Sequence, residues 1–180
     1  MKTLLISTCT HALSNKEFVL PISNILNENK HDILHFENCN KEILSKYDKI
    51  IICGTSMQDF RYSDSFPLFN DLLNEFNGPI LGICSGMHIL VSIFGMSDLI
   101  GKIEVGIVEV NTSVSNKLFE GKFQAYNLHN YSVEGCENFT VIARSKNSIQ
   151  AVKHEDREIY GISFHPEVRN EAVISNFLKI

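Results

Sequence analysis

The sequence predicts an α/β protein built on a doubly wound, mainly parallel sheet with helices on both faces. In the first half of the chain, short apolar runs alternate with segments of helical spacing, as in strand–helix–strand units. These runs are apolar throughout rather than alternately apolar and polar, which is typical of strands covered on both faces. The second half carries closely spaced strand signals, which predict a small antiparallel region in addition to the parallel sheet.

The elements are expected in the following order. A strand over residues 3–7 precedes a capping box, Ser14-Asn15-Lys16-Glu17, which predicts a helix whose apolar side chains begin at Phe18. A helix is expected over residues 66–76, where leucine and phenylalanine recur at helical spacing, and a closing helix over residues 171–178. The remaining strands are expected at residues 33–36, 50–53, 80–83, 103–110, 123–128, 139–144, 149–152 and 159–164.

Composition narrows the class of protein. The 180 residues suit one domain, 1–180, and a net charge of −5 provides no basic field for nucleic acid. The longest apolar stretch, residues 80–96, is interrupted by Cys84, Ser85, His88 and Ser92, so we expect a buried strand and helix rather than a membrane span. The five cysteines are an odd number without C-x-x-C spacing, which argues against disulfides and zinc and favours a reducing cytoplasm. No metal or cofactor is expected.

The most informative stretch is Gly82-Ile83-Cys84-Ser85-Gly86, which lies between a predicted strand and a predicted helix. Small residues around a nucleophile at such a turn form the nucleophile-elbow pattern, here with cysteine in the serine position. The turn lifts the sulfur into a cleft. The free N–H groups and positive dipole end of the next helix favour a thiolate and an oxyanion. The alternative is a structural cysteine that packs as a small apolar residue.

A second pattern, which reads His165-Pro166-Glu167, follows the last predicted strand. A thiol nucleophile needs an imidazole as base, and that imidazole needs a third group on its other nitrogen. In an extended segment His165 and Glu167 point the same way, and Pro166 keeps His165 out of the helical region. Because ligands bind at the carboxyl ends of strands in open α/β sheets, Gly54, Cys84 and His165 are expected to meet there. The alternative is a turn that only ends a strand.

Together the segments 82–87 and 161–168 resemble the two signatures of class I, triad-type glutamine amidotransferases, in residues, order and separation. Weaker landmarks are residues 50–54, the Glu104-Val105-Gly106 step and His129. The resemblance implies a flavodoxin-like fold and hydrolysis of the side-chain amide of glutamine through a thioester. It implies Cys84 as nucleophile, His165 as general base and Glu167 as the group that orients His165.

The same resemblance implies the rest of the site. The backbone N–H of Ser85 and one N–H from the Gly54-Thr55 loop are expected to hold the oxyanion. For His129 the alternative is a turn cap, since it is predicted at the end of a strand. The residues expected to bind substrate are Gly86, His88, His129 and Tyr131.

Two positions depart from the family pattern. The family usually has two glycines after its third strand, whereas this chain has Gly54-Thr55; a β-branched residue disfavours positive φ, so the donor loop is expected to rearrange. The family also usually has glutamine four residues after the nucleophile, and here that residue is His88. We interpret His88 as a polar lining residue; a different γ-glutamyl substrate and a weakened site are the alternatives.

The chain stops soon after Glu167, so a glutaminase of this length is expected to give ammonia to a separate, ATP-dependent synthetase. Its His-Pro-Glu-Val sequence and compact length are most similar to the free-standing amidotransferase subunits of archaeal-type GMP synthases. One alternative is a hydrolase that acts alone on γ-glutamyl bonds, and another is a catalytically weak binding or regulatory subunit. Neither nucleic acid nor a membrane is expected as a partner.

Overall fold

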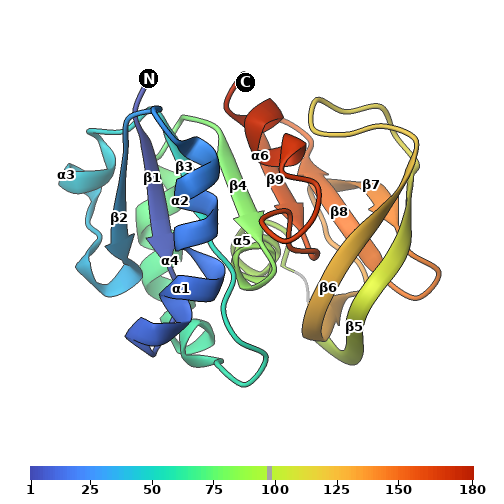
Figure 1. Ribbon diagram of the computed structural model, residues 1–180. Helices are drawn as coiled ribbons and strands as arrows, with labels where there is room; N and C mark the ends of the chain where they lie inside the picture. The colour runs from blue at the N-terminus through green and yellow to red at the C-terminus, as the bar shows by residue number, and fades with distance from the viewer. Residues whose placement is uncertain (97–98) are drawn as a thin grey trace.

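The computed structural model describes residues 1–96 and 99–180, which form one mixed sheet flanked by helices (Figure 1). Within these residues the strand order is β2-β1-β3-β4-β9-β8-β7-β5-β6. The strands are β1 (Thr3–Ser7), β2 (His31–His35), β3 (Lys49–Ile52), β4 (Ile80–Ile83), β5 (Leu99–Thr112), β6 (Lys122–Val133), β7 (Phe139–Arg144), β8 (Ile149–His154) and β9 (Ile159–Ile162). The helices are α1 (Asn15–Phe18), α2 (Leu20–Leu26), α3 (Lys41–Leu44), α4 (Phe66–Asn74), α5 (Ser85–Phe94) and α6 (Ala172–Phe177), with short 3₁₀ turns η1 (Ala12–Ser14), η2 (Phe36–Asn38) and η3 (Arg61–Ser65).

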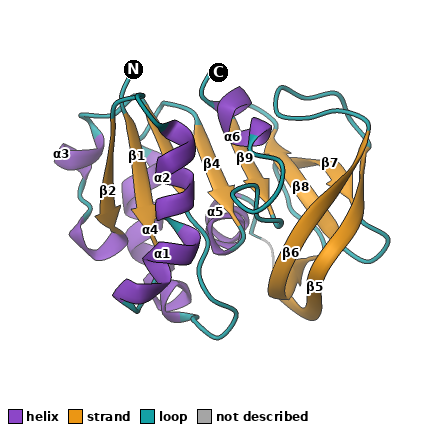
Figure 2. Cartoon of the chain, in the orientation of Figure 1, coloured by secondary structure: helices purple, strands orange, loops and turns teal. Residues whose placement is uncertain are grey.

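The predicted parallel sheet is confirmed. Strands β2, β1, β3, β4 and β9 are parallel neighbours, and β8, β7, β5 and β6 continue the sheet in antiparallel fashion. The antiparallel part is larger than expected, because β5 and β6 form a long ribbon. Only the end of β5 pairs with β7, through Asn111–Arg144 and Thr112–Ala143, so the ribbon leans away from the sheet (Figure 2).

Alternate residues of the parallel strands pack into two separate hydrophobic cores, one on each face of the sheet. Leu4 and Ile50 belong to the core on the side of α3, α4 and α5, whereas Leu5 and Ile51 belong to the core under α1, α2 and α6. All four side chains are fully buried. Burial on both faces explains why the strands read as continuous apolar runs.

The predicted capping box does not form. Residues Ala12–Ser14 already make a 3₁₀ turn, so Ser14 is helical (φ −63°) and its side chain caps nothing. A Ser N-cap needs an extended backbone to reach the N–H groups of the first turn. The predicted helix is also divided into α1 and α2 around Val19, because Pro21 has no N–H to continue the hydrogen-bond ladder.

Strand β6 runs to Val133, five residues beyond its predicted end, so His129 lies inside a strand and the turn-cap alternative is wrong. Asn127 and His129 alternate with outward residues and are buried. Because these inward side chains are polar, the apolar pattern of the sequence does not indicate this part of the strand. No helix in the described part of the chain is long and apolar enough to cross a bilayer.

Candidate active site

Cys84 occupies a strained turn between β4 and α5. Its backbone has φ 50° and ψ −104°, a conformation that non-glycine residues rarely adopt, and its N–H donates to the carbonyl of Ile162 on β9 at 2.8 Å. The flanking glycines explain the spacing of the motif. A Cβ atom on Gly82 would lie 2.5 Å from the backbone of Gly86, and one on Gly86 would lie 2.4 Å from the carbonyl oxygen of Ile52. The elbow can therefore form only where both positions lack a side chain.

His165 and Glu167 are brought together by a turn. The Glu167 carboxylate lies 2.7 Å from His165 Nδ1, and both side chains are 1% exposed. The extended segment predicted here is wrong, because the N–H groups of Val168 and Arg169 both approach the carbonyl of His165. The backbone N–H of His165 donates to the Tyr126 carbonyl of β6 at 2.8 Å. The antiparallel ribbon therefore fixes the position of the His165 backbone.

The imidazole of His165 is set against the thiol of Cys84. Burial disfavours its charged form, but interactions with Cys84 and Glu167 outweigh burial and raise the pKa of His165 well above its ordinary value. Within the described chain Nε2 makes no geometrically complete hydrogen bond, so it is available to a reacting group. The Cys84 Sγ itself approaches the carbonyl of Leu128 at 3.7 Å. This arrangement favours an imidazolium beside the sulfur at neutral pH.

Gly54 and Ser85 flank the same sulfur. A Cβ atom on Gly54 would lie 2.9 Å from His165 Cε1 and 3.4 Å from the Cβ of Cys84, so glycine allows the β3 loop to approach both groups. Neither Gly54 nor Thr55 adopts a positive φ, so the strain expected for a β-branched Thr55 does not occur. Ser85 begins α5, where first-turn N–H groups have no helical acceptor.

A small pocket of about 20 Å³ opens beside Cys84, between the β3–α4 loop and β6. His88 lines it and is buried. The hydroxyl of Tyr62 is hydrogen-bonded to His88 Nδ1 at 3.0 Å, and burial raises the pKa of Tyr62 far above its ordinary value, so the phenol keeps its proton. Burial, reinforced by His129, lowers the pKa of His88 to about 4, and the imidazole is neutral at pH 7. The lining residues are Thr55, Ser56, Met57, Asp59, Phe60, Tyr62, Cys84, Ser85, His88, Leu128, His129, Asn130 and Tyr131.

His129 enters this pocket from β6, next to a buried carboxylate. Its Nε2 lies 3.5 Å from Glu104 Oε2, and within the described chain neither ring nitrogen makes a geometrically complete hydrogen bond. Burial lowers the pKa of His129 although Glu104 opposes that shift. The same carboxylate accepts hydrogen bonds from the side chains of Asn127, Ser145, Asn147, Ser148 and Gln150. This set of donors holds Glu104 ionised and anchors β5, β6 and β8 behind His129.

The other predicted binding residues have different surroundings. Gly86 packs against Ile52 and does not line the pocket, whereas Tyr131 forms its rim, edge-on to the ring of Phe60 at 5.1 Å. The sequence analysis missed Asp59. This residue comes from an irregular loop, and only its contact with Thr10, 49 residues away, reveals it.

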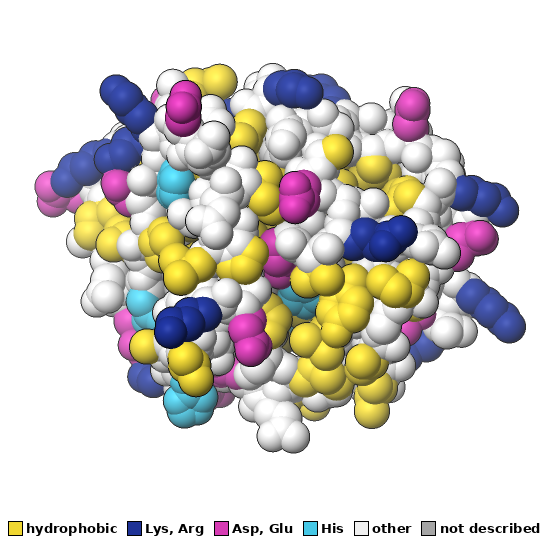
Figure 3. Space-filling model, in the orientation of Figure 1, with side chains coloured by type: hydrophobic (Ala, Val, Ile, Leu, Met, Phe, Trp, Pro, Cys, Tyr) yellow, Lys and Arg dark blue, Asp and Glu magenta, His cyan; other side chains and the backbone are white. Residues whose placement is uncertain are grey.

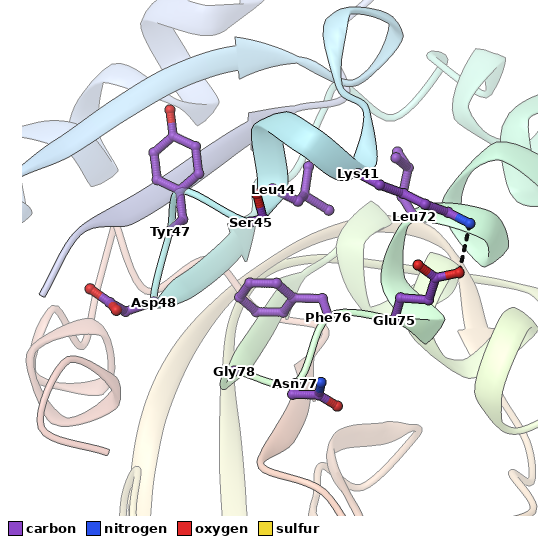
Figure 4. Close-up of a pocket in the computed structure, with 10 residues that line it drawn as sticks. All are labelled: Lys41, Leu44, Ser45, Tyr47, Asp48, Leu72, Glu75, Phe76, Asn77 and Gly78. Atoms are coloured by element: carbon purple, nitrogen blue, oxygen red, sulfur yellow. Dashed lines mark hydrogen bonds and ion pairs between the residues drawn. The ribbon is translucent and has the colours of Figure 1, made fainter.

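A larger pocket lies at the other end of the sheet. It measures about 420 Å³ and is formed by residues that precede β3 and β4, such as Asp48 and Gly78, at the sheet edge opposite Cys84 (Figure 4). The ion pair of Lys41 with Glu75 crosses it, and its described lining includes neither cysteine nor histidine. We place the candidate site at the smaller pocket because Cys84, the expected nucleophile, lines it.

Residues 10–179 match the profile of the family described as "Glutamine amidotransferase class-I". Among curated relatives, a glutamine-hydrolyzing GMP synthase subunit of Pyrococcus abyssi is 38% identical over 117 residues, which cover 59% of this chain and 62% of the relative. The corresponding GMP synthase subunit of Methanosphaera stadtmanae is 41% identical over 112 residues, covering 57% and 60%. The chain thus matches about three fifths of these relatives.

Two solved structures share the fold. A Thermoplasma acidophilum protein with a provisional description as a GMP synthase subunit superposes with a TM-score of 0.86 at 21% identity, over 99% of this chain and 92% of that one. A glutamine amidotransferase from Thermotoga maritima gives 0.72 at 20% identity, over 99% and 81%. Because the profile match extends over nearly its whole length, the chain belongs to the class I glutamine amidotransferase family.

Proposed function

We propose that this chain is a glutaminase that uses Cys84 to hydrolyse the side-chain amide of glutamine and supplies the ammonia to a separate synthetase. The observation that carries the proposal is the strained Cys84 elbow beside an imidazole that Glu167 holds at 2.7 Å. Family membership and relatives named as glutamine-hydrolysing GMP synthase subunits support the same reaction class. The names of those relatives make GMP synthase the first candidate for the synthetase.

In this mechanism the Cys84 thiolate attacks the amide carbon of glutamine, and the carbonyl oxygen becomes an oxyanion. The N–H groups of Ser85 and Thr55 stabilise that oxyanion, each by about 3 kcal/mol of barrier. The His165 imidazolium gives its proton to the departing nitrogen, which leaves as ammonia, and a thioester remains. His165, now neutral, takes a proton from water, and the resulting hydroxide attacks the thioester. The new carboxyl group of glutamate loses its proton to solvent, and the thiolate of Cys84 beside the imidazolium of His165 is restored. Glu167 stabilises the imidazolium in both steps.

Exposed apolar side chains support a partner at this edge of the molecule. Ile103, Val105 and Ile107 on β5 are 72%, 57% and 52% exposed. Val105 pairs with Leu128, which lines the thiol pocket, so this apolar face of the ribbon begins at the pocket rim. Figure 3 shows hydrophobic side chains gathered over β5 and β6. A synthetase that covers this face would receive ammonia where it is made.

One observation favours a second candidate, a stand-alone hydrolase of γ-glutamyl bonds. His88 replaces the glutamine that the family usually has four residues after the nucleophile, and its ring is held by Tyr62 rather than left free. A pocket with a different polar lining can select a different γ-glutamyl compound. This candidate predicts turnover of γ-glutamyl peptides without a partner.

The decisive experiment combines labelling with turnover. A diazoketone analogue of glutamine should modify Cys84 alone among the five thiols, as shown by peptide mapping, and Cys84→Ser should abolish glutamate release. Adding the cognate synthetase with its acceptor should raise turnover at least about tenfold, equivalent to ~1.4 kcal/mol of barrier. Labelling at Cys9 or Cys136, with Cys84 unmodified, would refute the glutaminase proposal. Turnover of a γ-glutamyl peptide, with none of glutamine, would favour the second candidate.

A further inference from the structure

Asp59 is a buried carboxylate that holds two loops together beside the thiol pocket. Its Oδ2 accepts from the Thr10 N–H at 2.7 Å and from the Thr55 hydroxyl at 2.8 Å, and its Oδ1 accepts from the Thr10 hydroxyl at 2.5 Å. Burial opposes ionisation, but these bonds and one from the Arg61 backbone lower the pKa of Asp59 below its ordinary value. Only 8% of Asp59 is exposed, and in the described chain no ion pair neutralises it. Such a carboxylate is costly to bury unless its hydrogen bonds are needed.

The loop after β1 also holds the opposite side of the β3 loop. The Thr8 hydroxyl donates to the carbonyl of Cys53 at 3.1 Å, and the Cys9 thiol donates to the carbonyl of Gly54 at 3.7 Å. The β3 loop is therefore held at three points by consecutive residues: its Cys53 carbonyl by Thr8, its Gly54 carbonyl by Cys9 and its Asp59 carboxylate by Thr10. The Gly54 carbonyl points towards Cys9. In a planar trans peptide the N–H points away from the carbonyl, so the Thr55 N–H is directed away from Cys9.

We propose that Asp59 is a positioning residue that fixes the Gly54–Thr55 peptide as an oxyanion donor; this inference rests on the proposed function. Cys9 holds the carbonyl of the peptide, and Asp59 holds the side chain of its second residue. Thr55 and Cys84 line the same pocket, and Gly54 lies against Cys84, so the fixed peptide borders the space where the oxyanion forms. The Thr55 hydroxyl thus has a use that a second glycine in its place would not have. A donor fixed beforehand needs no reorganisation during the reaction.

The test compares variants of the full chain. Asp59→Asn replaces one acceptor oxygen by an NH₂ group, which cannot accept from Thr10 or Thr55, and Thr55→Val removes the hydroxyl at nearly constant volume. Both should lower kcat for glutamine at least about tenfold, with KM within about twofold of wild type. Thr55→Ser keeps the hydroxyl and should retain most of kcat. Asp71→Asn is the matched control, because Asp71 is 66% exposed and pairs with Lys41 far from the thiol.

Alkylation of Cys84 by iodoacetamide, followed by peptide mapping, separates positioning from folding. This reaction forms no oxyanion, so its rate and the melting temperature should stay near wild type in Thr55→Val. Wild-type kcat in Asp59→Asn and Thr55→Val would overturn the inference. A parallel loss of kcat, alkylation rate and melting temperature in both variants would also overturn it, because the defect would then lie in folding. A rise in KM at constant kcat would overturn it as well, because Asp59 would then be a substrate ligand. If wild type releases glutamate from neither glutamine nor a γ-glutamyl anilide, the proposed function itself fails, and this inference fails with it.

Discussion

Replacing Glu167 with glutamine tests whether the carboxylate does more than fill space behind the imidazole. The variant keeps the volume of the side chain but removes its charge from a site where both partners are 1% exposed. A buried hydrogen bond to a charged group contributes about 1.5–3 kcal/mol. If Glu167 stabilises the imidazolium of the transition state by this amount, kcat should fall by about 10-fold to about 150-fold. Steady-state glutamate release measures this loss.

The pH profile of the same variant gives a second, independent readout. Cys84 and Glu167 raise the pKa of His165 against the effect of burial, so the imidazolium persists above the ordinary histidine pKa and is lost as pH rises through the raised value. The alkaline decline of kcat should therefore move to lower pH in Glu167→Gln. Glu171→Gln, an exposed carboxylate four residues later, is the control and should change neither quantity. A folded Glu167→Gln variant with the wild-type kcat and alkaline limb would refute the reasoning.

Three further predictions follow from single contacts. Gly86→Ala places a Cβ 2.4 Å from the Ile52 carbonyl and should destabilise the fold by about 1–3 kcal/mol, lowering the melting temperature by circular dichroism, whereas Gly101→Ala meets nothing within 4 Å and should not. His88→Gln should keep glutaminase activity and lower KM for glutamine. Burial holds the pKa of His88 at about 4, so the free energy of unfolding of wild type should fall by up to ~3 kcal/mol as pH falls from about 6.5 to about 4. In acid unfolding, His88→Gln should show a smaller fall in this free energy. Val105→Glu should abolish activation by the synthetase and leave partner-free glutamate release unchanged.

The parallel half of the fold could be predicted because local pattern and tertiary burial agree there. Residues 80–83 are apolar throughout because β4 is covered on both faces. Gly82 is needed by a contact with Gly86, four residues away, whereas Gly86 is needed by a contact with Ile52 on the neighbouring strand β3. The meeting of Cys84 and His165 followed from topology alone, since parallel strands β4 and β9 are neighbours and end at the same edge. Local apolar pattern together with the order of parallel strands was sufficient for these features.

The remaining features depend on distant partners. Pro21 divides a helix that the apolar spacing predicts as continuous, and Ser14 cannot cap because the preceding turn is already helical. His129 was expected at the end of a strand because its buried partner, Glu104, lies on another strand. Asp59 stands in a loop without periodicity, and its role depends on Thr10, 49 residues away. A single sequence contains no local signal for such contacts.

The two departures from the family pattern, Thr55 and His88, have partners in the same loop. Asp59 accepts from the Thr55 hydroxyl, and the Tyr62 hydroxyl is hydrogen-bonded to the His88 imidazole. A site that had decayed would be expected to leave buried polar atoms without partners at the changed positions, because nothing would maintain the matching residues. Here both substituted side chains are buried and bonded, and both partners line the thiol pocket. This pairing favours an active site adapted as a unit over the weakened-site alternative.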